Sequence, residues 1–472
     1  MMTVGGGWCR AVRAISMLLA AALGVLGLTT GCGSPAGENT TRSAGITVYS
    51  NVSVIDPTGG TVRGGMAIVV DGERIRSVLP LRDAGIPASG TKVVDAKGAY
   101  ALPGLIDAHV HLATDPNQRY AQALMRRDLY SGITAVRDMA GDTRALAELA
   151  EAARAKEIPA PDLFYAAVMA GPRFFDDPRT KSSTKGEVPG RAPWMRAVTD
   201  GTDIPKAVSD ARGTGATGIK LYAELSGQLA QRITAEAHRQ GMRVWSHAML
   251  FPTTPSEVVD AGVDTVSHAG LLAYESPLTE STPLPTAYRD NAVPDAQLEV
   301  DGPVFGRLFE RMRQHGTVFE PTLWVYDNIE RWMTANPGQG RPPHSIPLDL
   351  AGRLTAAAHR AGIDIAAGTD FTTDREDNYP GLYRELEMLQ QKAGLSPAEV
   401  LRSATLINAG TLGAVADMGD IRPGTLANFL LLTQNPLETV TNLRSITMTV
   451  KRGTAYPRQE YRPIAADEWQ HE

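Results

Sequence analysis

The segment GLIDAHVHL, residues 104–112, is the most informative part of this 472-residue chain. A short apolar run ends there in two histidines, His109 and His111, which are separated by one residue. Alternate residues of a strand point to the same side, so one strand end directs both imidazoles toward one point. Imidazole nitrogens suit zinc and related ions. The pattern therefore predicts a metal site at the end of a strand, and its alternative is a pair of histidines packed in a turn.

Further short apolar runs follow this segment at regular intervals. Helical stretches separate most of them, and two of these stretches begin with capping-box patterns, Thr254 with Glu257 and Ser396 with Glu399, each with a proline at the first helical position. Strands that alternate with helices indicate an α/β fold, specifically a (β/α)8 TIM barrel. The eight predicted strands are 104–109, 133–138, 163–169, 218–222, 243–246, 264–267, 317–321 and 364–368.

The segments before and after the barrel both have β patterns. Residues 45–103 contain short alternating runs with glycine and Asp-Gly turns, and residues 415–465 are similar. We therefore predict a small β-sandwich domain formed by both termini, with the barrel at 104–414. Long loops are expected after the third, sixth and seventh strands. They are candidates for substrate selection or a lid, because such loops surround the mouth of a barrel.

The N-terminus resembles a bacterial lipoprotein signal peptide. Arg10 and Arg13 precede an apolar run at 15–28, which is short for a membrane span, and the sequence LTTGCGS then places a small residue before Cys32. We expect a signal peptide at 1–31, a lipid on Cys32 and a flexible tether at 32–44, which gives a lipid-anchored protein of the cell envelope. The alternative is an ordinary signal peptide with an accidental cysteine.

The amino-acid composition and net charge indicate which other classes of function do not fit this chain. Hydrophobic residues make up 43% and charged residues 21%, which is typical of a globular protein. The net charge of -6 and the lack of a long basic run argue against a nucleic-acid partner. A small-molecule substrate is expected, and a homo-oligomer is compatible with the sequence.

Three more candidate metal ligands stand at predicted strand ends. His247 and His268 each end an apolar run, and Asp370 follows Gly368-Thr369 at the last strand. With His109 and His111 they would meet at the mouth of one barrel. The other five histidines are expected to be structural or solvated; they are His238, His315, His344, His359 and His471.

Lys220 ends the fourth predicted strand. A buried ammonium group is costly, so burial near metal ions should lower the pKa of this lysine. A neutral amine can capture carbon dioxide, and the resulting carbamate is an oxygen ligand able to bridge two metals. The alternative is an ordinary ammonium group paired with Glu224 or Asp138.

This set of residues, in this order along eight strands, resembles the amidohydrolase superfamily. It is most similar to the imidazolonepropionase-like and prolidase-like branch with a carboxylated lysine. The resemblance covers nearly the whole chain after the leader, including ALPGLIDAHVHL at 101–112 and GDIRPGTLANFLLLTQNPLE at 419–438. In the second segment Asn428 stands where the family usually has aspartate, at a position that we expect to be structural.

The resemblance implies two divalent metal ions, with zinc as the expected ion. His109, His111 and Asp370 would hold the first metal, and His247 and His268 the second. Carboxylated Lys220 and a hydroxide would bridge the two metals. Asp370 would then act as general base and general acid.

Two residues are candidates for substrate binding. Tyr222 points to the same side of its strand as Lys220 and could hydrogen-bond a carbonyl or carboxylate. Arg137, at the end of the second strand, could pair with a substrate carboxylate.

The expected reaction is hydrolysis of an amide or peptide bond, as in a dipeptide or an N-acyl amino acid. A lactonase or an organophosphate or ester hydrolase is the alternative enzyme, because the metal ligands do not distinguish these substrates. An inactive cell-surface binding protein is the alternative from another class, although a complete ligand set argues against it.

Overall fold

The computed structural model describes residues 45–85, 90–276, 284–288, 290, 297–414 and 417–469. The predicted signal peptide, the tether and Cys32 lie outside these residues. Within the described ranges, no helix combines the length and apolar character needed to cross a lipid bilayer.

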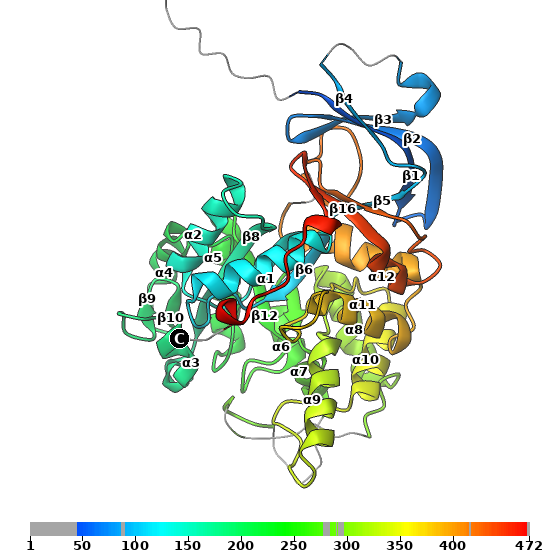
Figure 1. Cartoon of the computed structure of the whole chain (residues 1–472). Helices are drawn as coiled ribbons and strands as arrows, with labels where there is room; N and C mark the ends of the chain where they lie inside the picture. The colour runs from blue at the N-terminus through cyan, green and yellow to red at the C-terminus, as the bar shows by residue number, and fades with distance from the viewer. Residues whose placement is uncertain are drawn as a thin grey trace, which may run out of the picture. The chain divides into compact units, whose positions relative to one another are not determined.

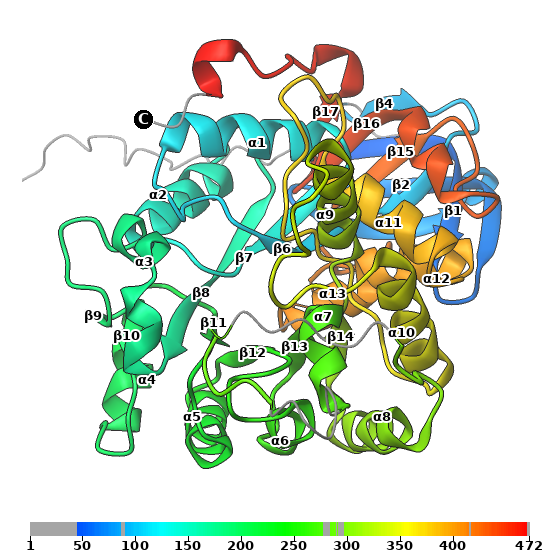
Figure 2. The ribbon, with the colours of Figure 1, turned by 90° about the horizontal axis from the view of Figure 1, so that it is seen from below.

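Parallel strands form a barrel in sequence order, each paired with the next. The predicted eighth strand is reduced to one bridge, in which Ile365 pairs with Phe319. On its other side the amide of Ala108 donates to the carbonyl of Ala367 at 3.0 Å, which closes the barrel. The predicted (β/α)8 barrel is confirmed (Figure 2). Its seven regular strands are β6 (Leu105–Val110), β7 (Ile133–Asp138), β8 (Asp162–Ala170), β11 (Gly218–Leu221), β12 (Arg243–His247), β13 (Thr265–Ser267) and β14 (Val318–Glu320).

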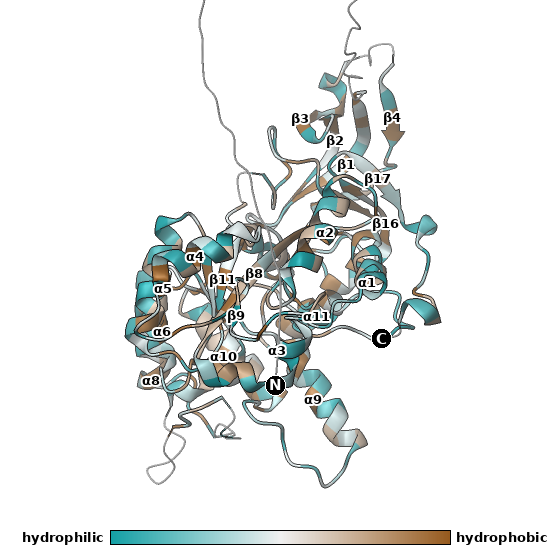
Figure 3. Ribbon diagram, turned by 90° about the vertical axis from the view of Figure 1, so that its left-hand side faces the viewer, coloured by the Kyte–Doolittle hydropathy of each residue, from teal (hydrophilic) through white to brown (hydrophobic). Residues whose placement is uncertain are grey.

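Amphipathic helices surround these strands. In α5, for example, Leu229, Ile233 and Ala237 recur at helical spacing and are buried. Figure 3 shows the same division, with hydrophobic colouring in strands such as β8 and β11 and mixed colouring in the outer helices. The main helices are α1 (Gln118–Tyr130), α2 (Thr143–Arg154), α4 (Ile204–Gly213), α5 (Gly227–Arg239), α6 (Pro255–Asp260), α8 (Pro303–His315), α9 (Leu323–Ala335), α10 (Leu348–Arg360), α11 (Gly381–Gln391) and α12 (Pro397–Arg402).

Both predicted capping boxes are present. The Glu257 carboxylate accepts from the amide of Thr254 at 2.8 Å at the start of α6. The Glu399 carboxylate accepts from the amide of Ser396 at 2.7 Å at the start of α12. A π-helical turn, Ser403–Ile407, and the short α13 (Asn408–Thr411) follow α12.

A second, eight-stranded sheet combines both ends of the described chain (Figure 1). The predicted β domain is confirmed, although hydrogen bonds join its strands into one sheet and not two. Tyr49, Ile68 and Phe429 belong to its own buried core. The strands are β1 (Thr47–Asp56), β2 (Thr61–Asp71), β3 (Arg74–Pro80), β4 (Lys92–Asp95), β5 (Tyr100–Pro103), β15 (Phe429–Leu432), β16 (Ile446–Lys451) and β17 (Thr454–Pro457).

Asn428 connects this sheet to the first barrel strand. Its carbonyl accepts from the amide of Gly104 at 2.9 Å, directly before β6. Its buried side-chain oxygen accepts from the amide of Arg452 at 2.8 Å. The contacts agree with the structural role expected for this position.

The three long loops contain more secondary structure than the sequence suggested. The loop after β8 holds α3 (Pro178–Ser182), β9 (Arg191–Ala192) and β10 (Met195–Ala197), and the segment after β13 begins with α7 (Ala269–Leu272). The first half of the loop predicted at about 324–347 belongs to the helix α9 (Leu323–Ala335). A residue far away in the sequence caps its first turn, because the amide of Trp324 donates to the Glu385 carboxylate at 2.7 Å.

Candidate active site

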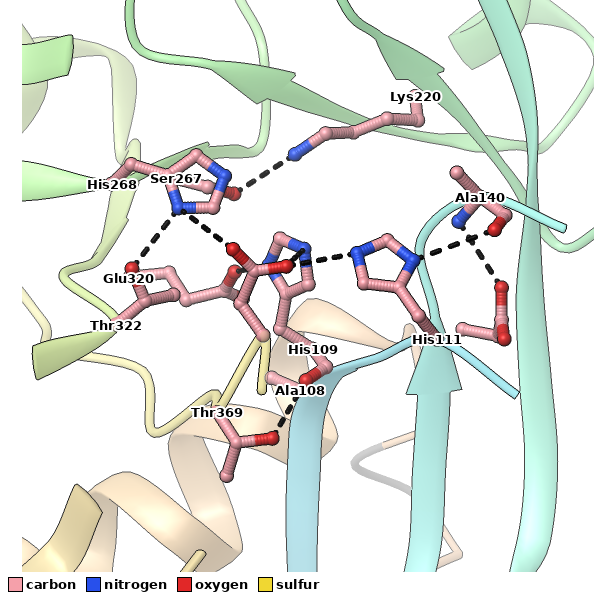
Figure 4. Close-up of polar contacts among 12 residues, drawn as sticks. Ala108, His109, His111, Ala140, Lys220, Ser267, His268, Glu320, Thr322 and Thr369 are labelled. Carbon is pink, nitrogen blue, oxygen red and sulfur yellow. Dashed lines mark hydrogen bonds and ion pairs between the residues drawn. The ribbon is translucent and has the colours of Figure 1, made fainter. Parts of the chain in front are cut away.

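All six predicted metal ligands line one cavity of about 500 Å³ at the carboxyl ends of the barrel strands. They come from five separate strand ends, including the irregular eighth strand. Figure 4 shows His109, His111, Lys220 and His268 directed toward a common centre. The remaining two ligands on the cavity wall are His247 and Asp370.

Asp370 forms the centre of the histidine cluster. Its Oδ1 lies 2.8 Å from His111 Nε2 and 3.2 Å from His109 Nε2, and its Oδ2 lies 3.7 Å from His268 Nδ1. One ligand atom from each of His109, His268 and Asp370 falls within 4.8 Å of the others. Burial tends to raise the pKa of Asp370, but His109 and His268 hold it well below its usual value. An ionised carboxylate among imidazoles is a donor set that fits a divalent metal ion.

His247 and His268 are held in the form that binds metal. Burial lowers the pKa of His268 to about 3 and the pKa of His247 well below its usual value. Both imidazoles are therefore neutral near pH 7, with a lone pair available. Among the described residues nothing hydrogen-bonds the buried Nδ1 of His247. Because buried polar atoms normally have partners, this nitrogen fits a bound ion.

Lys220 has no carboxylate partner in the described part of the chain. Its ammonium nitrogen donates to the hydroxyl of Ser267 at 3.1 Å, and the side chain is buried. The alternative pairing with Glu224 or Asp138 is wrong, because Glu224 pairs with Arg173 and Asp138 accepts from backbone amides. Burial lowers the pKa of Lys220 to about 7, so a large fraction of the amine is neutral near physiological pH.

Two predicted metal ligands and the neighbouring Thr322 have left-handed backbone conformations. The φ angles are 77° at His268, 53° at Asp370 and 52° at Thr322, whose hydroxyl lies 3.0 Å from His268 Nδ1. Each such conformation costs about 1–3 kcal/mol for a non-glycine residue. Hydrogen bonds hold it in place: the His268 amide donates to Glu320 O and the Asp370 amide to His109 O, both at 2.8 Å. Strain at two predicted ligands is typical of a functional site.

Glu320, at the end of β14, is a residue that the sequence analysis missed. One carboxylate oxygen binds His109 Nδ1 and the other binds the Arg137 guanidinium, and all three side chains are buried. Burial tends to raise the pKa of Glu320, but Arg137 and His109 lower it to about 2. Glu320 therefore fixes the orientation of His109, so that Nε2 faces Asp370.

The geometry argues against the predicted role of Arg137 in substrate binding. Its guanidinium is buried, donates to Ala108 O at 2.6 Å and lies over the Trp245 ring at 4.6 Å. Arg137 is not among the residues that line the cavity. Its contacts place it beneath the site, where it supports Glu320 and the first barrel strand.

Substitution Glu320→Gln is expected to weaken metal binding roughly 10- to 100-fold, because His109 loses its orienting partner. It should also cost about 3–5 kcal/mol of stability, since the buried Arg137 charge loses its counter-ion. Metal titration and thermal unfolding measure the two effects. Glu236→Gln, which removes an exposed pair with Arg239 on α5, is the matched control. Metal affinity equal to that of the wild type would remove Glu320 from this role.

Tyr222 lies in the cavity wall as the sequence predicted. Its ring centroid is 4.0 Å from that of His247 and 4.4 Å from that of Phe174. Burial raises the pKa of Tyr222 well above its usual value, so the phenol stays protonated and can donate a hydrogen bond.

All three long loops contribute to the cavity wall. Arg179 comes from the loop after β8, Tyr288 from the segment after β13, and Val325 from α9. His344 also lines the cavity, where it stacks on Tyr288 at 4.9 Å and bonds the Tyr274 hydroxyl at 2.9 Å. From the sequence alone His344 is expected to be structural or solvated, because its place in the wall depends on a loop whose path the sequence does not reveal.

The fold and the cluster of possible metal ligands are compatible with a metal-dependent hydrolase. The family model for the amidohydrolase family matches residues 100–455, and the chain belongs to this family. The match covers the barrel and the returning strands of the β domain.

Three individual proteins illustrate what this chain is similar to. An uncharacterized protein of Mycobacterium tuberculosis is 24% identical over 399 residues, covering 78% of this chain and 88% of the relative. The structure of a candidate prolidase from Bifidobacterium longum is 25% identical, with a TM-score of 0.66 and coverage of 90% of this chain and 98% of the other. A Xaa-Pro dipeptidase structure shares the fold at 19% identity, with a TM-score of 0.67 and coverage of 87% and 100%.

Proposed function

We propose that this protein is a binuclear metal-dependent amidohydrolase that cleaves an amide or peptide bond next to a free carboxylate. The convergence of four histidines, Lys220 and Asp370 on one cavity carries this proposal. Dipeptides and N-acyl amino acids are the substrate class. The likeness to a candidate prolidase supports an amide or peptide bond as the target.

The donor set divides between two metal positions. His109, His111 and Asp370 would hold one ion, and His247 and His268 the other, with zinc as the expected metal. Carboxylated Lys220 would bridge the two, and its burial without a carboxylate partner among the described residues supports this role. When bound, the two ions would supply Lewis-acid activation of the attacking water and of the scissile carbonyl.

The chain's own residues then move protons and orient the substrate. Asp370 is ionised, and its position between His109 and His111 suits it to accept a proton from the attacking water and to return it to the leaving amine. The protonated hydroxyl of Tyr222 can donate to the carbonyl oxygen of the substrate.

A substrate panel tests the proposed reaction. Purified protein loaded with zinc is assayed on dipeptides, N-acyl amino acids, lactones and phosphotriesters. Turnover should be fastest on amides with a free carboxylate. Preferential cleavage of lactones or phosphotriesters would reject the amide assignment, and metal binding without turnover of any class would favour a binding protein.

We also propose that the protein is anchored to a membrane of the bacterial cell envelope through a lipid on Cys32. The sequence around this cysteine supports the proposal, and these residues lie outside those that the structure describes. Cys32→Ala should move the protein from the detergent-soluble membrane fraction to the aqueous fraction. Mass spectrometry of the N-terminal peptide provides the second readout, and an unlipidated wild-type peptide would contradict the anchor.

A further inference from the structure

Beyond the metal ligands, the cavity has one cationic position. Arg179 is the only arginine among the described residues that line the cavity, and Lys220 is the only lysine. Asp370 is the only carboxylate in the same wall. Since Lys220 and Asp370 belong to the metal site, Arg179 is the group left to attract an anionic part of a substrate.

An ion pair orients the Arg179 guanidinium and leaves one of its nitrogens available to a ligand. It lies on α3, where Nε and Nη2 donate to the two carboxylate oxygens of Asp177 at 3.1 and 2.9 Å. No described residue accepts a hydrogen bond from Nη1, and the side chain is 55% exposed. The pair with Asp177 therefore orients the guanidinium and leaves one nitrogen for a ligand.

Aromatic side chains line the same cavity as this arginine. They are Phe174, Tyr222 and Tyr288. The ring of Tyr222 is 5.7 Å from that of Tyr288, and Phe174 is 6.3 Å from Tyr288. Apolar rings beside a guanidinium favour a ligand with a carboxylate next to an apolar side chain.

This group also lies close to the metal ligands. The Tyr222 ring centroid is 4.0 Å from that of His247, a predicted metal ligand. The α-carboxylate of a leaving amino acid is only two covalent bonds from the scissile nitrogen. A carboxylate at Arg179 would therefore be compatible with a scissile bond at the metal site.

The wall formed after the seventh and eighth strands carries several apolar side chains. Val325 and Ile329 project from α9, which follows the seventh strand, and Phe371 follows the eighth. In an eight-stranded barrel these strands lie across from the third and fourth, which position Arg179 and Tyr222. Phe371 is 54% exposed and lines the cavity, so its ring is accessible to a ligand there.

We propose that the substrate is an N-acyl amino acid with an apolar acyl group, whose α-carboxylate binds Arg179 and whose side chain packs on Phe174, Tyr222 and Tyr288. The acyl group lies against Val325, Ile329 and Phe371. This inference rests on the proposed amidohydrolase function and narrows its substrate class.

The test compares two substrates that differ only in the carboxylate. N-Hexanoyl-L-phenylalanine carries it, and N-hexanoyl-L-phenylalaninol has a hydroxymethyl group in its place. Wild-type protein should prefer the acid roughly 10- to 100-fold in kcat/KM, mainly through KM, as expected for a charge-assisted hydrogen bond. Arg179→Ala should reduce this preference to near one, and Arg179→Lys should retain part of it.

Arg173→Ala is the matched control, because Arg173 lies on the same loop, pairs with Glu224 at 3.4 Å and does not line the cavity. It should keep the full preference for the acid. A full preference in Arg179→Ala, or no preference in the wild type, would overturn the role of Arg179.

Failure of the proposed function gives a different result. If the wild type cleaves neither compound nor any member of the amide panel, the amidohydrolase proposal is rejected. Calorimetric binding of N-hexanoyl-L-phenylalanine still tests whether Arg179 binds the carboxylate. Binding to the wild type and not to Arg179→Ala would support this role, and equal binding to both would overturn it.

A comparison of substrates with different acyl-chain lengths tests the proposed binding site of the acyl group. The wild type should prefer N-hexanoyl- over N-acetyl-L-phenylalanine, because each buried methylene adds to binding. Ile329→Ser should reduce that preference without changing the preference for the carboxylate. An unchanged chain-length dependence would remove α9 from the acyl subsite.

Discussion

Lys220→Ala is expected to lower kcat/KM roughly a thousandfold or more and to reduce the metal content. The variant loses the proposed bridging ligand, and with it about 4 kcal/mol of transition-state stabilisation from a paired metal site. Short carboxylic acids such as acetate should restore part of the activity, because a free carboxylate can occupy the space left by the carbamate. Steady-state kinetics and elemental analysis measure both effects.

Two control variants sharpen this result. Lys220→Arg keeps a charge that cannot be removed and so cannot be carboxylated, and we expect it to be inactive without rescue. Lys206→Ala removes an exposed lysine that pairs with Asp210 on α4, and it should behave like the wild type. Wild-type activity in Lys220→Ala would contradict the proposed two-metal site.

Asp370→Asn is expected to lower kcat roughly 10²- to 10⁴-fold while the protein stays folded. The amide oxygen of asparagine can still accept a hydrogen bond from His109 or His111, but asparagine cannot take up and return a proton. Circular dichroism and thermal unfolding test the fold, and single-turnover kinetics test the chemical step. Asp210→Asn on the outer helix α4 is the control for a lost surface charge. Normal turnover in Asp370→Asn would assign the proton transfer to another group.

The sequence reveals the barrel strands and the predicted ligands because both depend on local patterns. Short apolar runs predict strands, and a polar residue at the end of such a run is expected at the mouth of a barrel. His247 and His268 are recognisable in this way. The eighth strand is the weakest in the structure, with one bridge at Ile365, and its sequence still marked its place.

The supporting residues could not be predicted, because their partners are distant in the sequence. Glu320 contacts His109 and Arg137, which are 211 and 183 residues away. Without that contact Arg137 looks like an accessible cation at a strand end, although it is buried. Helix α9 was expected to be a loop because its cap, Glu385, lies 61 residues beyond Trp324.

The residues that line the cavity wall could not be predicted from the sequence either. Arg179 is one of several charged residues in a polar loop, and nothing in the local sequence separates it from Arg173. Only the folded loop places Arg179 in the cavity and pairs Arg173 with Glu224. The proposed specificity would therefore depend on loop geometry, whereas the residues at the strand ends already indicate metal-dependent hydrolysis.

The number of metal ions per chain is the most direct test of the central claim. Elemental analysis of the purified protein, set against its concentration from amino-acid analysis, gives this number. Our account predicts about two divalent ions per chain, since the proposed donor set would divide between two positions that share Lys220. A reproducible value of about one, unchanged by added zinc and bicarbonate, would contradict a binuclear site.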